Sequence, residues 1–125
     1  MSQPRQSRAL IIVNTDFRSG AGAAVLGTRR GARREAEKLS RALSRLNYEV
    51  TLTHNKTAKE MEALYQRERG CRHGDYFVSI ISSHGEEGVV FGCDSEPVRL
   101  SRIFWILASE ECPVLTEIPK IFFIQ

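Results

Sequence analysis

The first fifty residues combine a continuous apolar run, a helical repeat and an alternating segment. Residues 8–14 read Arg-Ala-Leu-Ile-Ile-Val-Asn, and such an unbroken apolar run predicts a strand buried on both faces. Residues 18–31 are rich in glycine, alanine and arginine, which is typical of a mobile loop. Residues 48–53 alternate between apolar and polar side chains and predict a second strand. Between these segments, apolar side chains recur at helical spacing at Ala36, Leu39, Ala42, Leu43 and Leu46.

The middle of the chain predicts a capped helix followed by a third strand. Residues 57–60 read Thr-Ala-Lys-Glu, a capping box in which the threonine and the glutamate satisfy each other's backbone N–H groups. Residues 67–75 contain glycine, cysteine, arginine and histidine and predict a loop, and residues 76–82 predict the third strand. The side chains expected to face inward from the helix are Met61, Leu64 and Tyr65.

The last third predicts a hairpin, a helix and a final strand. Residues 89–91 and 98–100 are short apolar segments on either side of Asp-Ser-Glu-Pro, a pattern that predicts a hairpin. Residues 120–124 read Lys-Ile-Phe-Phe-Ile and predict the fourth main strand. Ser101 is expected to cap the intervening helix, whose inward side chains are Ile103, Phe104 and Leu107.

Strands that alternate with helices at these lengths predict an α/β fold. Its sheet should be mainly parallel, with right-handed crossovers and with helices on both faces. We expect residues 1–7 to be a disordered tail and residues 8–125 to form one domain, because the sequence shows no internal repeat.

Composition and charge exclude several function classes. The chain is 42% hydrophobic and 26% charged with a net charge of +3, as in an ordinary soluble domain. It has no apolar run of about 20 residues and no signal-peptide pattern, so we expect a cytoplasmic protein with no membrane partner. Its three cysteines lack CxxC spacing, so we expect no disulfide framework, no metal site and no cofactor.

Three other patterns have both functional and structural interpretations. An arginine cluster over residues 29–34 has no interleaved aromatic residues, so we expect no nucleic-acid partner. Gly20-Ala21-Gly22 lacks the third glycine of a dinucleotide fingerprint. Cys112 is expected to be a packed or half-exposed thiol rather than a nucleophile. Cys71 with His73 is too small a set to predict a metal site.

The candidate chemistry lies at the ends of two predicted strands. His84 follows the third strand and Gln125 follows the fourth. The carboxyl ends of parallel strands meet at one edge of a sheet, so a base at one end can reach a nucleophile at the next. Gly85 would leave its backbone N–H accessible to an oxyanion.

The run Ser83–Gly88 (Ser-His-Gly-Glu-Glu-Gly), followed by Val-Val-Phe-Gly, resembles the catalytic-histidine motif of the caspases. Further segments are similar to the first strand of that family, to the Arg-x-Gly before its first helix, to its helix-to-strand turn and to the strand before its nucleophile: residues 8–17, 29–31, 46–50 and 118–125. The resemblance covers residues 8–125 and corresponds to the caspase large subunit. It implies a caspase-like three-layer sandwich, of which this chain is the large-subunit part.

The resemblance implies a cysteine endopeptidase that cleaves after aspartate in apoptosis-type proteolysis. It makes His84 the general base and Gly85 an oxyanion donor. It places Arg29 and Gln125 in the primary pocket, where a guanidinium suits a carboxylate, and Ser83 beside the substrate groove. The implied partners are a caspase small subunit or other caspases, and aspartate-containing protein substrates.

The expected nucleophile is missing from the printed sequence. The caspase signature places Gln-Ala-Cys downstream of the histidine, and here Gln125 is the last residue. The first helix opens Gly-Ala-Arg-Arg-Glu over residues 31–35 without a capping side chain, and Ser82 replaces an aliphatic residue usual in the family. These departures favour an inactive member, a pseudoenzyme. The alternative is a non-catalytic decoy or regulator that binds caspases or their substrates.

Overall fold

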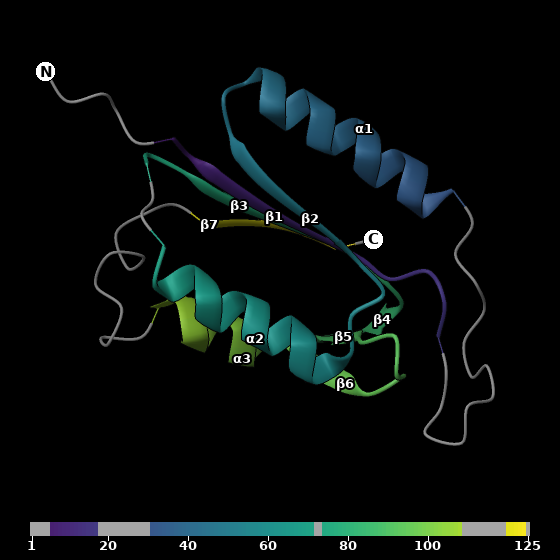
Figure 1. Cartoon of the computed structure of the whole chain (residues 1–125). Coiled ribbons are helices and arrows are strands. Elements are labelled where there is room, and N and C mark those ends of the chain that lie inside the picture. The colour runs from purple at the N-terminus through teal and green to yellow at the C-terminus, as the bar shows by residue number, and fades with distance from the viewer. Residues whose placement is uncertain (1–5, 18–30, 72–73, 109–119, 125) are drawn as a thin grey trace, which may run out of the picture.

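A computed structural model of the chain describes residues 6–17, 31–71, 74–108 and 120–124, the last segment by its backbone alone. Its centre is a four-stranded parallel sheet in the order β2-β1-β3-β7 (Figure 1). The central strands β1 and β3 are buried almost throughout, which is why apolar residues dominate both of their sequences. The four strands are β1 (Arg8–Val13), β2 (Glu49–His54), β3 (Phe77–Ser82) and β7 (Lys120–Ile124).

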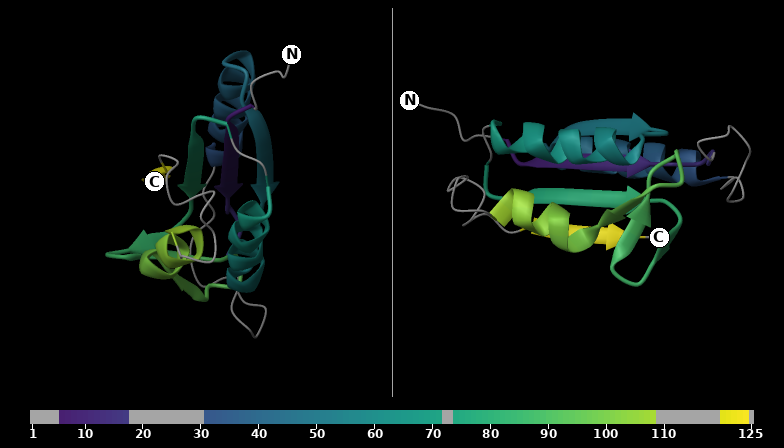
Figure 2. Two further views of the ribbon diagram at one scale, coloured as in Figure 1. Left: turned by 90° about the vertical axis from the view of Figure 1, so that its left-hand side faces the viewer. Right: turned by 90° about the horizontal axis from the view of Figure 1, so that it is seen from below.

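Helices cover both faces of this sheet. Helix α1 (Ala32–Arg45) lies on one face, and helices α2 (Ala58–Arg69) and α3 (Leu100–Ala108) lie side by side on the other (Figures 1 and 2). The predicted α/β class, with a parallel sheet between two helical layers, is therefore confirmed.

Two apolar cores lie on the two faces, because successive side chains of a strand point to opposite sides. The core under α1 contains Ala9, Ile11, Val13, Ala32, Ala36, Val78 and Ile80. The core under α2 and α3 is larger and contains Leu10, Ile12, Met61, Tyr65, Phe77, Ile81, Val90, Val98, Ile103, Ile106 and Leu107.

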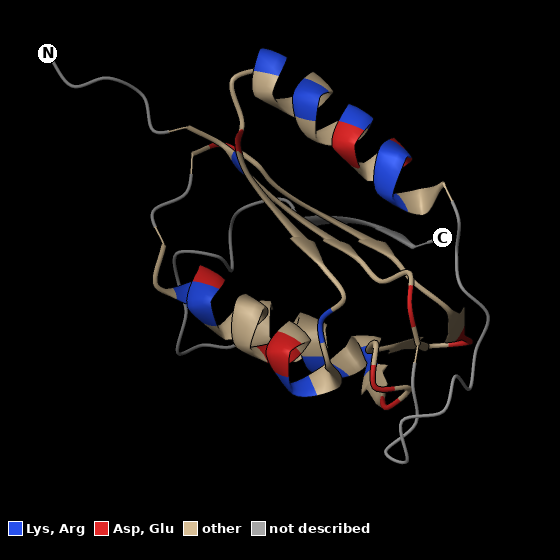
Figure 3. Cartoon of the chain, turned by 45° about the vertical axis from the view of Figure 1, so that its right-hand side comes forward, with Lys and Arg blue, Asp and Glu red and all other residues tan. Residues whose placement is uncertain are grey.

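Helix α1 begins without a side-chain cap, as the sequence predicts. Gly31 precedes it with φ 85°, and no side chain accepts a hydrogen bond from its first turn. The apolar stripe is narrower than predicted, since Leu39 is 38% exposed and Leu46 is 70% exposed. Exposed lysine and arginine residues recur along the helix, and they are blue on its ribbon in Figure 3: Arg33, Arg34, Lys38, Arg41 and Arg45.

A second, antiparallel sheet follows β3. It contains β4 (Gly85–Glu86), β5 (Val89–Phe91) and β6 (Pro97–Arg99) in that order. The predicted hairpin is confirmed, with Val89 opposite Arg99. The sequence analysis missed β4, because two residues are too short to show an alternating pattern.

Two helix predictions need correction. Helix α2 continues to Arg69, so the predicted loop from residue 67 begins too early; the stretch before Gly70 is polar but is made of good helix formers. Helix α3 begins at Leu100, so Ser101 lies inside its first turn and is not the cap. Its inward side chains are Ile103, Ile106 and Leu107, whereas Phe104 is 45% exposed.

An ion-pair cluster closes the amino-terminal edge of the sheet, with Arg8 and Glu68 largely buried and Glu49 exposed. Arg8 donates from Nε to Glu68 Oε2 at 3.1 Å and from Nη2 to Glu68 Oε1 at 3.0 Å. Its Nη1 lies 3.1 Å from Glu49 Oε2. The hydrogen bond with Glu68 raises the pKa of Arg8 above its ordinary value. The cluster therefore joins β1, β2 and the end of α2 by charge-assisted contacts.

Some predictions fall outside the described residues. They concern residues 1–5 of the predicted tail, the loop over residues 18–30 with Gly20–Gly22, and His73 and Cys112. Within the described ranges, no helix has the length and apolar character needed to cross a membrane.

Candidate active site

His84 lies two residues beyond the carboxyl end of β3, at the junction with β4. Its side chain is half-buried. The imidazole packs against Phe17, with ring centroids 4.7 Å apart and ring planes at 54°. Phe17 is 2% exposed, so the ring that contacts the histidine is itself held by surrounding residues. The tilted contact restricts the orientation of the imidazole.

The residue before the histidine is held by a buried hydroxyl. Ser83 is 1% exposed, and its Oγ donates to the carbonyl oxygen of Phe91 at 2.6 Å. The backbone of His84 is bonded to the same residue, because the Phe91 N–H donates to the His84 carbonyl at 2.9 Å. These bonds attach the end of β3 to β5. They make Ser83 a positioning residue for His84, and its contribution to the substrate groove stays a prediction.

Asn14 at the end of β1 connects the same region to the start of α2. Its Nδ2 donates to the Phe91 carbonyl at 3.1 Å and lies 3.5 Å from Ser83 Oγ. Its Oδ1 accepts a hydrogen bond of 2.9 Å from the Lys56 N–H. Asn14 is fully buried, and a buried amide in several hydrogen bonds stiffens its surroundings. The ends of β1, β3 and β5 therefore meet around one side chain.

A second asparagine holds the segment that leads to Phe17. Asn55 Oδ1 accepts hydrogen bonds from the N–H groups of Thr15 at 2.9 Å and Asp16 at 3.2 Å. Asn55 itself has φ 49°, a conformation that asparagine tolerates better than most residues. The segment after β1 is thereby fixed up to the phenylalanine that contacts His84.

The register of β4 sets the direction of the Gly85 N–H. Gly85 pairs with Val90, and the bond between Phe91 N–H and His84 O flanks that pair. In an antiparallel ladder the residue between flanking bonds directs its own N–H away from its partner strand. The Gly85 N–H therefore points outward from β4, which is the edge strand of the small sheet among the described strands.

Gly85 also has a steric reason to be glycine. A Cβ atom built on it would lie 2.7 Å from the Val89 carbonyl oxygen, closer than ordinary contacts allow. Gly92 is tighter still, because a Cβ there would lie 2.3 Å from the Ala58 backbone nitrogen. The hairpin thus lies directly against the start of α2, where Asp94 Oδ1 accepts from the Ala58 N–H at 3.2 Å.

The strand before Gln125 lies beside the strand before His84. Strand β7 pairs with β3 in parallel, with Ile124 opposite Ile81. The two carboxyl ends therefore lie at the same edge of the sheet (Figure 1). Gln125 and Arg29 themselves are outside the residues that the structure describes, so their predicted place in a primary pocket stays a prediction.

The two described cysteines have different surroundings. Cys93 lies in the loop between β5 and β6, where burial raises the pKa of its thiol and Asp94 adds to the shift. A raised pKa lowers the thiolate fraction and the nucleophilicity at neutral pH. Cys71 follows α2, and its Sγ lies 3.5 Å from the Arg67 carbonyl oxygen. In the part of the chain that the structure describes, no group of three or more metal-ligating side chains gathers.

Sequence reasoning missed two residues of the site, Asn14 and Phe17. Asn14 ends the first apolar run, and a polar residue directly after a buried strand is a signal that could have marked it. Phe17 belongs to the segment 8–17 that resembles the first strand of the caspases. Its contact with the histidine, however, joins residues 67 positions apart and has no local signal.

A family model and individual relatives of known sequence both indicate the same family. Residues 6–125 match the family described as Caspase domain. The chain is 30% identical to caspase-7 of Gallus gallus over 127 residues, covering 100% of the chain and 40% of the relative. It is 33% identical to caspase-3 of Bos taurus, covering 45% of that relative, and 33% identical to caspase-10 of Homo sapiens, covering 23%. The chain thus spans less than half the length of these relatives.

Two of the segments that carry the family resemblance build this edge of the sheet. The Ser-His-Gly run turns from β3 into β4, and the segment of residues 8–17 supplies the side chains that hold it. A domain match over nearly the whole chain agrees with this arrangement. The chain belongs to the caspase family.

Proposed function

We propose that this chain is the histidine-bearing part of a cysteine endopeptidase that cleaves proteins after aspartate, with His84 as its general base. The observation that carries the proposal is the position of His84, beyond the end of β3 and against Phe17, at the edge where β7 also ends. A nucleophile that follows β7 would come next to a histidine that follows β3.

The chemistry of each group follows from this placement. The His84 imidazole takes the proton from a cysteine thiol, and the thiolate attacks the carbonyl carbon of the scissile bond. The outward Gly85 N–H donates to the oxyanion that forms on that carbonyl. The imidazolium then returns the proton to the leaving amine. The hydrogen bonds of Ser83 and Asn14 keep His84 in place while its charge changes.

Specificity for aspartate is assigned to Arg29 and Gln125, with Ser83 at the edge of the substrate groove. A guanidinium grips a carboxylate through two parallel hydrogen bonds. This assignment is supported by the match of Arg29-Arg30-Gly31 and of residues 118–125 to the corresponding caspase segments.

We further propose that the 125-residue chain has no proteolytic activity by itself. A histidine without a thiolate partner offers only general-base assistance to water. Of the described cysteines, Cys93 has a raised pKa, and Cys71 lies beyond the end of α2, in the cavity that contains the Arg8–Glu68 pair at the amino-terminal edge of the sheet. Neither is placed as a substitute nucleophile.

A second candidate function is that of a decoy or regulator that binds active caspases. The observation that favours it is the position of β7, which has β3 on one side and no further strand on the other within the described residues. An edge strand can pair with a strand of another chain. The partner that such an edge would accept is a caspase small subunit, or a caspase whose own strand at this position is unpaired.

A chimera tests the proposed catalytic role. Residue Gln125 is joined to the Ala-Cys of the caspase signature, followed by the aligned carboxyl-terminal remainder of human caspase-10. We expect this chimera to cleave a fluorogenic peptide after aspartate, and we expect His84→Ala to abolish cleavage. His54→Ala is the matched control, because His54 ends β2 on the same side of the sheet and has no proposed catalytic role. Cleavage that survives His84→Ala would disprove the role of His84.

A binding experiment separates the two functions. The 125-residue chain is mixed with an active caspase, and both complex formation and cleavage of the fluorogenic peptide are measured. Binding that lowers the caspase activity supports the decoy function. If the chain is inactive and binds no caspase, the decoy function is contradicted. The catalytic function is then tested by the chimera alone.

A further inference from the structure

The outer edge of β2 presents unpaired backbone groups. Within the described sheet, β2 has β1 on one side and no strand on the other. The Glu49 N–H donates to Ser7 O at 2.8 Å and the Asn55 N–H donates to Val13 O at 2.9 Å. In a parallel ladder alternate residues bond to the same neighbour. The residues whose N–H and C=O groups face outward are therefore Val50, Leu52 and His54.

A groove runs beside this edge, between β2 and α2. One cavity of 230 Å³ is lined by Lys56, Glu60, Ala63, Leu64 and Arg67. A second cavity of 270 Å³ shares Leu64 and Arg67 and continues to Arg8, Glu49 and Thr51. Because the two cavities share lining residues, they form one groove that follows the length of the strand.

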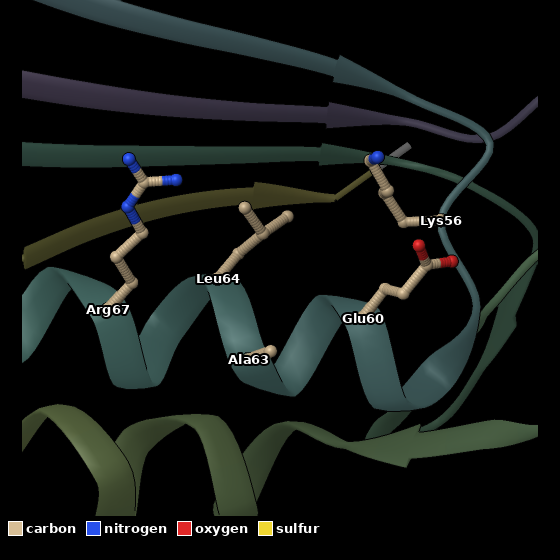
Figure 4. A pocket seen from close by; sticks show the side chains of 5 residues that line it. All are labelled: Lys56, Glu60, Ala63, Leu64 and Arg67. Carbon is tan, nitrogen blue, oxygen red and sulfur yellow. The ribbon is translucent and has the colours of Figure 1, made fainter.

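Three cations and three anions line the groove, and two of the cations lie outside its ion pairs. Figure 4 shows Lys56 and Arg67 reaching towards the sheet from the two ends of the first cavity, with Leu64 between them. Glu60 accepts a hydrogen bond of 3.0 Å from the Thr57 N–H in the capping box. Glu49 and Glu68 are paired with Arg8. Among the described side chains, Lys56 and Arg67 have no ion-pair partner.

We propose that the β2 edge and this groove form a docking site for an acidic protein segment that binds as an added β-strand. Main-chain hydrogen bonds to Val50, Leu52 and His54 would hold the segment, and its side chains would enter the groove, as in other cases of strand addition. Lys56 and Arg67 select carboxylates at the two ends, and Ala63 with Leu64 selects an apolar side chain between them.

The geometry defines a sequence pattern for the partner. Alternate residues of a strand share a face, so the pattern is acidic-x-apolar-x-acidic. Four residues of a strand span about 13 Å, and the helical rise from Glu60 to Arg67 is about 10 Å, with Lys56 just beyond it. The two carboxylates can therefore meet the two cations at the same time. This site is separate from the His84 edge and does not depend on the proposed catalytic function.

The first test uses charge. A labelled peptide containing Glu-Thr-Leu-Thr-Glu is titrated with the full 125-residue chain and its fluorescence anisotropy is followed. We expect Lys56→Glu with Arg67→Glu to weaken binding about tenfold and to transfer the preference to a Lys-Thr-Leu-Thr-Lys peptide. The matched control is Arg41→Glu with Arg45→Glu on α1, which changes the net charge equally on the opposite face. An equal loss in the control, or no gain by the basic peptide, would overturn the proposal.

The second test uses the backbone. A peptide with N-methyl groups at alternate residues keeps its charges but cannot pair with β2, so we expect it to lose binding. Leu52→Pro removes an outward N–H without removing a hydrogen bond to β1. We expect this variant to bind the unmodified peptide more weakly. If that variant fails to fold, amide hydrogen exchange of the unchanged protein decides, with protection expected at Val50, Leu52 and His54 when the peptide binds.

The other possible occupants of this edge give different results. Equal binding of the N-methylated peptide, or equal competition by a DNA oligonucleotide, would show attraction by charge alone and would refute strand addition. Self-association of the chain that Leu52→Pro abolishes, without peptide binding, would show that a second copy occupies the edge. Either result would show that the partner at this edge is not an acidic segment.

Discussion

The Ser83 hydroxyl donates to the carbonyl oxygen of Phe91 at 2.6 Å, and this bond joins the end of the main sheet to the small one. The same carbonyl accepts from Asn14 Nδ2 at 3.1 Å. His84 is the next residue after Ser83, so the direction in which its side chain leaves the sheet depends on these two donors. Neither donor needs to touch a substrate for the histidine to depend on it.

Ser83→Ala should therefore lower stability and disturb the histidine together. Removing the hydroxyl leaves Phe91 O with Asn14 as a donor, so we expect a loss of about 1 kcal/mol in the free energy of unfolding, measured with urea. Ser44→Ala on the exposed side of α1 is the control and should cause no loss. In the active chimera, Ser83→Ala should lower kcat more than KM. An unchanged kcat with reduced stability would show that Ser83 has a structural role only.

Gly85→Ala should destabilise the β4–β5 pair. The new Cβ atom would lie 2.7 Å from the Val89 carbonyl oxygen, which is backbone and cannot rotate away. We expect a loss of about 1–3 kcal/mol by urea unfolding. Gly70→Ala is the control, since its Cβ would lie 3.7 Å from the Arg67 carbonyl oxygen. A variant as stable as the control would show that β4 moves freely.

His54 should make stability depend on pH between about 5.5 and 7.5. Burial lowers the pKa of His54, and the nearby Arg33 and Lys56 lower it further, while Glu37 opposes them. The folded state then binds fewer protons than the unfolded state, whose histidine titrates near 6.5. Stability therefore falls as the pH drops through about 6.5.

We expect His54→Gln to reduce this decline in urea unfolding measured at the two ends of that range. The range lies above the titration of ordinary carboxyl groups near pH 4, so they contribute little to it. A direct check is an NMR titration of the His54 ring, which should show a midpoint below 6.5. A midpoint at or above that value would contradict the assigned environment.

The Arg8–Glu68 pair should be worth more to stability than an exposed pair. The side chains of Arg8 and Glu68 are only 13% and 5% exposed, so Glu68→Gln leaves a charged guanidinium short of a partner. We expect a loss of about 3 kcal/mol, reduced if Glu49 compensates. The exposed pair of Arg33 and Glu37, 3.9 Å apart, is the control, and Glu37→Gln should cost less than about 0.5 kcal/mol. Equal losses would show that burial has no influence here.

The isolated chain should self-associate through β7. The strand reads Lys-Ile-Phe-Phe-Ile over residues 120–124 and has no strand beyond it in the described sheet. An apolar edge strand without an interior charge is a template for pairing between molecules. Sedimentation should show oligomers that Phe122→Lys reduces. A stable monomer at tens of micromolar (roughly), unchanged by that substitution, would contradict this expectation.

Much of the layer arrangement was predictable because the apolar patterns are strong. The apolar run of residues 9–13 and the mostly apolar residues 77–82 are typical of buried strands, and the capping box of Thr57 and Glu60 marks the start of α2 directly. In α3 the sequence Ile-Phe-Trp-Ile-Leu is apolar on every side. The choice between Phe104 and Ile106 as the inward residue depends on how the helix lies over the sheet, which no local pattern contains.

The site was predictable only where it follows strand ends. His84 could be placed because the carboxyl ends of parallel strands meet at one edge. Asn14 and Phe17 could not be assigned a role, since their partners are residues far along the chain and, for Asn14, a backbone carbonyl. The pairing of Gly85 in β4 was also beyond reach, because it depends on how Val89 and Val90 turn back.

The hydrogen bonds of Asn14 have a consequence for folding. The bond from Asn14 to Phe91 joins residues 77 positions apart, and the bond to Lys56 joins residues 42 apart. Contacts between distant residues form only after long loops have closed. His84 therefore has no fixed place in a chain that is still being synthesised or only partly folded. The orientation of the histidine is a late product of folding, so a partly folded copy cannot present it to a substrate or a partner.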